Sequence, residues 1–472
     1  MSFAAKRLFS SSASPITLTL KPSPSKAHHH RPLPANAFPS GFLLGGLHVG
    51  VKKQAGLPDL AIILSTSSTP TAAAASFTRN TFRAAPVLVS EEVLQKSGGW
   101  ARGLVVNSGC ANAVTGRKGL EDAWKMVEET DALLSPLSST GNSNTTGKSK
   151  ETLVMSTGVI GQLLPIDAIL SGIRSQSSAS PTRVLGDDFS SWENAAKAFM
   201  TTDTFPKLRA RTFVLGGREY RMAGMTKGAG MIHPNMVPAK TEFGPLHATL
   251  LGCIMTDVAI TPRGLQSALT YAVDRSFNSI SVDGDMSTND SICVLANGAA
   301  APPGLVVEEG TQEYEIFKEE LTNFAADLAK LVVRDGEGAT KFVTVTVKSA
   351  PTYEDAHSIA SRISTSALVK TALYGEDANW GRILAATGSV PSSDKIDPTK
   401  VSVTFVPSDG TSALPVLVNG EPIPVDEARA KEILGLEDFE LQVELGVGEA
   451  EAKYWTCDFS YEYVRINGDY RS

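Results

Sequence analysis

The sequence has few cysteines and lacks any long apolar run. Four cysteines stand among 472 residues, and no two of them form a C-x-x-C pair. Scattered cysteines are typical of buried thiols rather than of a zinc site or a disulfide framework. No segment approaches the roughly 18 consecutive apolar residues that a membrane helix needs. We therefore expect no membrane span, and we assign no metal ligands.

Acidic residues are also missing from the start of the chain, where none precedes Asp59. This segment is rich in serine and carries basic residues such as Lys6 and Arg7. Such a composition is typical of an organelle transit peptide, with a merely disordered tail as the alternative. We predict a mitochondrial transit segment at residues 1–32 and a location in the mitochondrial matrix.

The formal net charge of the whole chain, -7, argues against a nucleic-acid partner.

Short β-prone runs and helical patterns follow one another through the rest of the chain. The runs "RGLVVNSG", "ETLVMSTGVIG", "FVTVTVKSA", "KVSVTFVP" and "FELQVELGVG" predict strands. Apolar periodicity predicts helices over 120–134, 262–277 and 313–333. The order lacks a regular βαβ rhythm, so we predict an α/β fold of layered sheets covered by helices rather than a Rossmann or barrel fold. The chain ends in "VRINGDYRS", with its C-terminus a few residues past an apparent strand.

Polar loops come directly after several of these strands. "NSGCANAVTG" contains Asn107 and Asn112, and "MSTGVIG" contains Thr157 and Gly158. Such loops can present backbone N–H groups to a developing negative charge, although ordinary turn chemistry has the same composition. No G-x-S-x-G, H-x-x-x-H or G-x-G-x-x-G motif is present. The residues therefore favour, for an enzyme, a hydroxyl nucleophile among backbone donors.

Taken in order, the polar blocks resemble the glutamate N-acetyltransferase/ornithine acetyltransferase family of arginine biosynthesis. The resemblance runs from about Phe38 to Ser472. It is carried by "FPSGFLLGGLHVGVKK", "FTRNTFRAAPV", "NSGCANAVTG", "STGVIG", "TTDTFPK", "KGAGMIHPNM", "ATLLGCIMTD", "VDGDMSTND", "RDGEGATK", "GEDANWGRI" and "CDFSYEYVRINGDYRS". It implies an α/β fold of the family's own type, superficially similar to that of N-terminal-nucleophile hydrolases.

The resemblance also implies that the precursor cleaves itself at Ala248-Thr249. Residues 33–248 would then form an α chain and residues 249–472 a β chain that begins with the nucleophile Thr249. Val237 to His247 is an insertion relative to the family pattern, and we expect it to be a surface excursion. It makes Thr241 a rival for the nucleophile, but "EFGPLH" after Thr241 is unlike the family and "LLGCIMTD" after Thr249 is like it.

By the same resemblance, the nucleophile takes an acetyl group from N-acetylornithine and passes it to glutamate in a ping-pong cycle. Acetyl-CoA is a further candidate donor, and no bound cofactor is implied. The two chains of one precursor would form a heterodimer, and two heterodimers a heterotetramer. Thr157 and Gly158 match the residues that stabilise the oxyanion. The substrate-binding positions map onto Thr201, Lys227, Thr249, Glu337, Asn467 and Ser472.

The chain departs from the family pattern at two further positions. Cys110 stands where asparagine is expected, which we interpret as a packing change, and Ser472 replaces a terminal threonine but keeps a hydroxyl group.

Two rival functions stay open at this stage. An amidohydrolase with the same self-processing chemistry would pass the acyl group to water rather than to glutamate. A ligand-binding protein that kept only the fold would stay uncut. The Ala248-Thr249 pair and the matched Thr157 and Gly158 argue against the ligand-binding protein, whereas only the acceptor of the acyl group distinguishes the amidohydrolase from the acetyltransferase.

Overall fold

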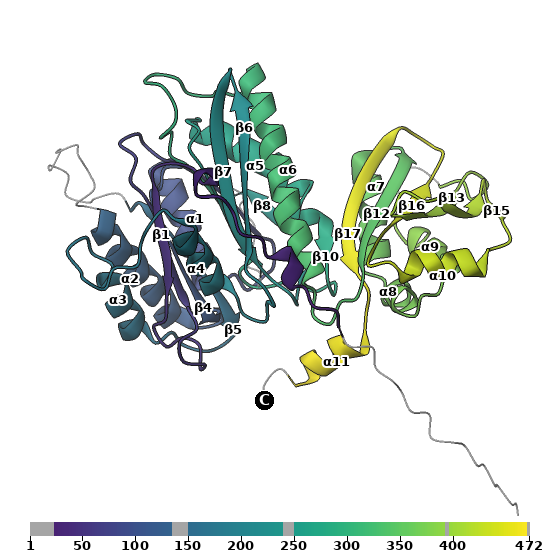
Figure 1. Cartoon of the computed structure of the whole chain (residues 1–472), viewed down its shortest axis with the longest axis horizontal. Coiled ribbons are helices and arrows are strands. Elements are labelled where there is room, and N and C mark those ends of the chain that lie inside the picture. The colour runs from purple at the N-terminus through teal and green to yellow at the C-terminus, as the bar shows by residue number, and fades with distance from the viewer. Residues whose placement is uncertain (1–22, 135–149, 239–249, 392–395, 470–472) are drawn as a thin grey trace, which may run out of the picture.

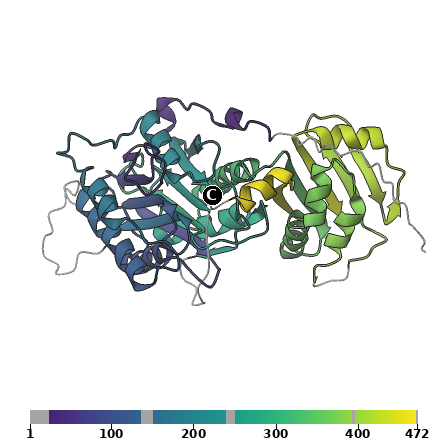
Figure 2. The same cartoon turned by 90° about the horizontal axis from the view of Figure 1, so that it is seen from below.

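The computed structural model describes residues 23–134, 150–238, 250–391 and 396–469. These residues form three sheets of four, six and seven strands. The first two sheets lie in one body and the third in a second body beside it (Figure 1), as the turned view also shows (Figure 2). The predicted α/β class with layered sheets and covering helices is confirmed. In the described part of the chain, no helix is long and apolar enough to cross a membrane.

The four-stranded sheet has the order β1-β2-β4-β5. Its strands are β1 (Phe42–Leu47), β2 (Leu60–Ser65), β4 (Gly103–Cys110) and β5 (Thr152–Val159). Its helices are α1 (Ala85–Ser97), α2 (Gly116–Leu134), α3 (Ile166–Arg174) and α4 (Phe189–Phe199). Helices α1 and α2 pack against β5, and α4 packs against β1 and β2. The pairing of β4 with β5 is parallel, so the polar ends of both strands meet at one edge.

The six-stranded sheet has the order β6-β7-β9-β11-β3-β8 and is buried on both faces. Its strands are β3 (Ala72–Thr78), β6 (Lys207–Leu215), β7 (Arg218–Lys227), β8 (Met236–Pro238), β9 (Leu251–Thr256) and β11 (Ser291–Ala296). Ala73 and Ala75 face the core shared with the four-stranded sheet, whereas Ala72 and Ala74 face helices α5 (Pro262–Asp274) and α6 (Gln312–Arg334). Burial on both sides explains why the neighbouring strands β3, β9 and β11 are almost wholly apolar.

Strand β9 lies between β7 and β11 in this sheet. Strand β7 comes from the segment before residue 248, and β9 and β11 come from the segment after it. The two predicted chains, 33–248 and 249–472, therefore contribute strands to one sheet. Residues 239–249, which hold most of the insertion, Ala248 and Thr249, lie outside the described residues, as does Ser472.

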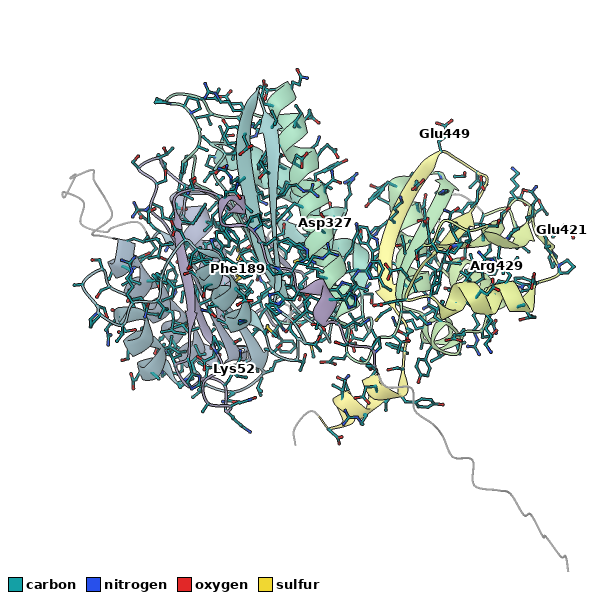
Figure 3. All side chains as sticks on the ribbon, viewed as in Figure 1. Lys52, Phe189, Asp327, Glu421, Arg429 and Glu449 are labelled. Carbon is teal, nitrogen blue, oxygen red and sulfur yellow. The ribbon has the colours of Figure 1, made fainter. Side chains whose placement is uncertain are left out.

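The seven-stranded sheet has the order β10-β17-β12-β16-β13-β14-β15. Its strands are β10 (Ile280–Ser281), β12 (Phe342–Ala350), β13 (Ser402–Pro407), β14 (Leu414–Val418), β15 (Glu421–Pro422), β16 (Asp438–Glu444) and β17 (Ala450–Cys457). Its helices are α7 (Tyr353–Ser364), α8 (Ala367–Tyr374), α9 (Trp380–Thr387) and α10 (Glu427–Gly435). Burial alternates along β13, as its sequence predicts for one covered face. Glu421 and Arg429 mark the outer end of this body in Figure 3.

The predicted strands and the three predicted helices are confirmed, as is the burial of all four cysteines as free thiols. The end of the chain differs from the prediction. Strand β17 ends at Cys457, and helix α11 (Tyr461–Gly468) follows it, so "VRING" is helical. The Ser460 side chain caps this helix by accepting a hydrogen bond from the N–H of Tyr463. A serine cap ahead of "YEYVRING" is a start signal that the sequence already contained.

A buried carboxylate fixes the loop after β1. Asp59 is fully buried, and its oxygens accept hydrogen bonds from the N–H groups of Val49, Gly50, Val51 and Lys52 at 2.7–3.0 Å. Four backbone donors satisfy a charge that would otherwise be costly to bury. Lys52 marks this loop at the lower end of the sheet in Figure 3. The loop in turn lies against the end of β4, where the backbone of Val51 closely approaches Gly109.

The substitution Asp59→Ala should lower the free energy of unfolding by about 3 kcal/mol or more. The reason is that hydrogen bonds to a charged group contribute about 1.5–3 kcal/mol each and four donors would lose their acceptor. Urea unfolding followed by circular dichroism measures this. Asp397→Ala, at a carboxylate that is not buried, is the control. Equal stability of the two variants would contradict this account of the loop.

Candidate active site

The predicted oxyanion residues lie where β4 and β5 end side by side. Thr157 is buried and pairs with Ser108, and Gly158 pairs with Gly109. Gly158 has φ +126°, and a Cβ at this position would lie 2.3 Å from the carbonyl carbon of Gly109. Only glycine fits such a crossing. The close approach thus fixes the backbone that carries Thr157.

Lys227 is brought to Thr157 from the other sheet. It is the last residue of β7, its side chain is buried, and its Nζ lies 3.3 Å from the Thr157 hydroxyl. Burial lowers the pKa of Lys227, and the carboxylate of Asp203 opposes that shift. In the sheet, Lys227 pairs with Leu251, two residues after Thr249. A buried cation therefore connects the predicted oxyanion loop to the strand that follows the predicted cleavage bond.

Asn289 ties the same two sheets together. Its side-chain amide donates to the carbonyl oxygen of Ala111 at 2.6 Å and to that of Ser156, immediately before Thr157. It also accepts a hydrogen bond from the hydroxyl of Thr288. Because the side chain is buried, these bonds are made away from water and are costly to lose. Asn289 thus locks the ends of β4 and β5 to the loop before β11.

Asp290, the residue after Asn289, binds Leu250, which follows Thr249 in the chain. Its carboxylate accepts a hydrogen bond from the N–H of Leu250 at 2.7 Å, and the carbonyl oxygen of Leu250 accepts one from the N–H of Ser291. Burial raises the pKa of Asp290 to about 7. Leu250 is therefore held from both sides by adjacent residues. Neither Asn289 nor Asp290 was predicted as a site residue, although "STND" precedes a buried strand.

Glu337 and Asn467 meet near this cluster. Glu337 accepts a 2.9 Å hydrogen bond from the side-chain amide of Asn467 and a further hydrogen bond from the Thr202 side chain. Its backbone N–H donates to the carbonyl oxygen of Ala229 at 2.8 Å. Its carboxylate covers Gly230, where a Cβ would lie 2.3 Å from Oε2. Burial raises the pKa of Glu337. Helix α11 therefore delivers Asn467 from the second body to the site.

A buried charge network supports the loop of Thr201. The N–H of Thr201 donates to Asp203 at 2.9 Å, and Asp203 also accepts from the N–H of Gly228. Lys207 Nζ lies 2.5 Å from Asp203 and 2.6 Å from Asp335, all three side chains being buried. Burial raises the pKa of Asp203, but the Lys207 and Lys227 ammonium groups outweigh it and keep that pKa low. No pattern in the sequence indicates this triad, which joins residues far apart in the chain.

Of the predicted site residues, the structure therefore brings Thr157 and Gly158 to Lys227, and Asn467 to Glu337. Thr201 is connected to Lys227 through Asp203, which accepts hydrogen bonds from the N–H of Thr201 and from the N–H of Gly228, the residue after Lys227. Where Ala248, Thr249 and Ser472 lie is not described, but Leu250 places the start of β9 among these groups.

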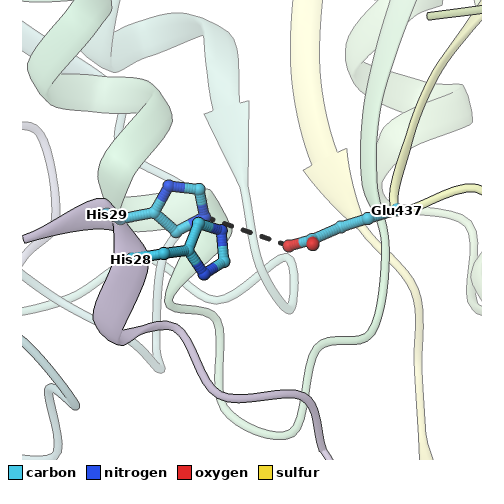
Figure 4. A group of neighbouring side chains, drawn as sticks. All are labelled: His28, His29 and Glu437. Atoms are coloured by element: carbon cyan, nitrogen blue, oxygen red, sulfur yellow. Dashed lines mark ion pairs between the residues drawn. The ribbon is translucent and has the colours of Figure 1, made fainter. Parts of the chain in front are cut away.

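One group of side chains has the composition of a metal site. His28, His29 and Glu437 present ring nitrogens and a carboxylate close together (Figure 4). The carboxylate already pairs with Lys26 Nζ at 2.7 Å. Burial, together with the positive charge of Arg334, lowers the pKa of His29 to about 4. The surroundings are thus cationic, and the group does not fit a metal ion.

Comparison with known proteins settles the family. The model of the ArgJ family matches residues 43–472. The chain belongs to the ArgJ family. The Arginine biosynthesis bifunctional protein ArgJ, mitochondrial, of Coprinopsis cinerea is 71% identical over 98% of this chain and 99% of its own. The protein of the same name from Cryptococcus neoformans is 54% identical over 99% of this chain and 98% of its own.

A crystal structure of the Arginine biosynthesis bifunctional protein argJ from Bacillus halodurans is 36% identical, covers 45% of this chain and 95% of its own, and has a TM-score of 0.41. A crystal structure of Ornithine Acetyltransferase complexed with Ornithine from Mycobacterium tuberculosis is 32% identical and has a TM-score of 0.34. It covers 43% of this chain and 98% of its own.

Membership of the ArgJ family confirms the predicted activity class and location. The protein is a mitochondrial acetyltransferase of arginine biosynthesis. Its site residues, its self-cleavage and its reaction cycle remain predictions.

The pKa of Asp290 predicts how stability depends on pH. In the unfolded chain this carboxyl titrates near pH 4, whereas in the folded protein its pKa is about 7. The folded state thus binds the proton more tightly, and the free energy of unfolding falls as pH rises from about 4 to 7. Asp290→Asn keeps an oxygen acceptor for Leu250 but cannot ionise. This variant should therefore lack the part of the decrease in the free energy of unfolding that comes from ionisation of Asp290.

Urea unfolding of wild type and Asp290→Asn at about pH 5 and pH 7 tests this prediction. Relative to wild type, the variant should gain stability on going to the higher pH. Asp397→Asn, at a carboxylate that is not buried, is the matched control. An unchanged pH dependence in Asp290→Asn would show that the Asp290 carboxyl titrates normally.

Proposed function

We propose that this protein is a self-cleaving acetyltransferase whose nucleophile is Thr249. It moves the acetyl group of N-acetylornithine to glutamate through an acetyl-threonine intermediate. The observation that carries the proposal lies at the start of β9, where Asp290 accepts a hydrogen bond from the N–H of Leu250, the neighbour of Thr249, and Lys227 of β7 pairs with Leu251. Asn289 joins this point to the Thr157 loop. These contacts at the start of β9 support the proposal.

In the cleavage step, the Thr249 hydroxyl attacks the carbonyl carbon of Ala248. The C–N bond breaks and the acyl group moves to oxygen, leaving an ester and the free amine of Thr249. Water then hydrolyses the ester and releases Ala248 as a carboxylate. The new α-amine has an ordinary pKa of about 8, so near neutral pH a useful fraction accepts the proton of its own hydroxyl.

In the transfer step, the same hydroxyl attacks the acetyl carbonyl of N-acetylornithine. The tetrahedral oxyanion would be stabilised by Thr157 and Gly158, and such donors are typically worth about 3–4 kcal/mol each. The buried ammonium of Lys227 adds positive charge beside Thr157. Ornithine leaves as the protonated amine, and the amine of glutamate then attacks the acetyl ester to give N-acetylglutamate.

Substrate binding follows from the charges around the site. Lys227 is suited to a substrate carboxylate and Glu337 to the side-chain amine of ornithine, with Asn467 orienting Glu337. Thr201 and Ser472 complete the proposed set of substrate-binding residues.

Acetyl-CoA would serve as a second donor, as the word bifunctional in the names of the relatives suggests. The two chains produced by cleavage would stay together as a heterodimer and pair into a heterotetramer.

Thr249→Ala should leave a single uncut chain without transfer activity, because no hydroxyl remains for either step. Thr249→Ser should still be cut, since serine also has a hydroxyl. Denaturing gels, N-terminal sequencing and assays with N-acetylornithine or acetyl-CoA as donor measure these outcomes. A new N-terminus that reads Thr-Leu-Leu-Gly-Cys supports the proposal.

Cleavage of Thr249→Ala at the same bond would contradict the role of Thr249. The acceptor decides between transferase and amidohydrolase: release of acetate at an undiminished rate when glutamate is absent would favour the hydrolase. Thr241→Ala is the matched control and should be cut and active.

A further inference from the structure

The N-terminal strap, residues Ser23–Arg31, lies within the predicted transit segment 1–32 but is built into the folded protein. Lys26 is 7% exposed although it precedes the first strand, and its Nζ lies 2.7 Å from Glu437 Oε1. The two residues are 411 positions apart. The short helix η1 (Ala27–His29) follows Lys26 directly.

The strap also binds the first body. His30 Nε2 lies 3.0 Å from a carboxylate oxygen of Glu193 on α4. The guanidinium group of Arg209 on β6 donates to the carbonyl oxygen of His29 at 3.0 Å. The strap is therefore held to the first body by two polar contacts and to the second by Lys26.

Figure 4 shows Glu437, the partner of Lys26 in the second body, together with His28 and His29 of the strap. His29 projects from the strap toward Glu437, which approaches from the loop ahead of β16, and His29 Nε2 lies 3.9 Å from Glu437 Oε1. Burial raises the pKa of Glu437, but the ammonium of Lys26 outweighs it and the net pKa is lowered. The carboxylate is thus ionised and depends on the strap for its counter-charge. Removing Lys26 would leave Glu437 without its ion-pair partner.

The strap also borders the turn that carries Glu337. Residues Ser23 to Ala27 line a cleft of about 270 Å³ together with Asp335, Gly336 and Gly338, on either side of Glu337. Asp335 belongs to the buried triad with Lys207. The strap therefore lies behind the part of the site that we assign to the ornithine amine.

We infer that the strap belongs to the mature enzyme and that mitochondrial processing cuts the chain upstream of Lys26. A leader is removed during or soon after import, while the chain is still unfolded. The contact with Glu437 can form only when almost the whole chain has entered and folded. A cut at residue 32 would discard Lys26 and His30 before their partners were in place. This conclusion does not depend on Thr249 or on the reaction cycle.

Import of the full-length precursor into isolated fungal mitochondria tests this inference. The N-terminus of the imported protein is identified by N-terminal labelling and mass spectrometry. We expect the imported chain to be cut upstream of Lys26 and to retain that residue. A first residue at Ala27 or beyond would overturn the inference.

Charge reversal in the recombinant full-length protein tests the contact itself. Lys26→Glu and Glu437→Lys should each lower the melting temperature by roughly 1–2 °C or more. The double variant restores opposite charges and should recover at least half of the loss. Lys431→Glu, at an exposed lysine on α10, is the control and should melt like wild type. Equal melting of all variants would show that the strap does not hold the second body.

Discussion

Asn289 and Asp290 lie next to each other at the start of β11, and each holds a different part of the site. Asn289 binds the carbonyl oxygens at the ends of β4 and β5, while Asp290 binds the N–H of Leu250. A displacement of this dipeptide would move the Thr157 loop relative to β9. Because both side chains are buried, their hydrogen bonds have few competing water molecules. The proposed chemistry depends on this link, since a nucleophile and its oxyanion donors must be aligned to well below 1 Å.

Two buried lysines make electrostatics a second constraint on the site. Lys207 and Lys227 are both buried, and a buried ammonium needs an opposite charge or a lowered pKa. Lys207 has two carboxylates, Asp203 and Asp335, and its pKa is raised. Burial lowers the pKa of Lys227, and the carboxylate of Asp203 opposes that shift. The two buried lysines of the site therefore differ in the direction in which their surroundings move the pKa.

Much of the fold could be predicted because its signals are local. The periodicity of residues 313–333 is that of a helix, and the alternation in "VSVTFV" is that of a strand with one covered face. The placement of Asn467 beside Glu337 could not be predicted in this way, because it depends on how α11 crosses between the two bodies. The resemblance to a family supplied both residues. It did not supply Asp290 or Asn289, whose roles appear only when three distant strands meet.

The folding of the N-terminal strap onto the protein could not be predicted either, because it too depends on contacts between residues far apart in the chain. A basic, serine-rich and acid-free composition indicates a transit segment, but composition does not reveal that Lys26 finds a carboxylate 411 positions away. Long-range ion pairs leave no pattern in a single sequence.

The central claim is that an acetyl group passes through the hydroxyl of Thr249. Intact-mass spectrometry of the purified, cleaved enzyme after exposure to N-acetylornithine without glutamate tests it most directly. The account predicts that the fragment beginning with Thr249 gains the mass of one acetyl group, that peptide mapping places it on Thr249, and that added glutamate removes it. An enzyme that turns over both substrates while this fragment never carries an acetyl group, or carries it on another residue, would contradict the account.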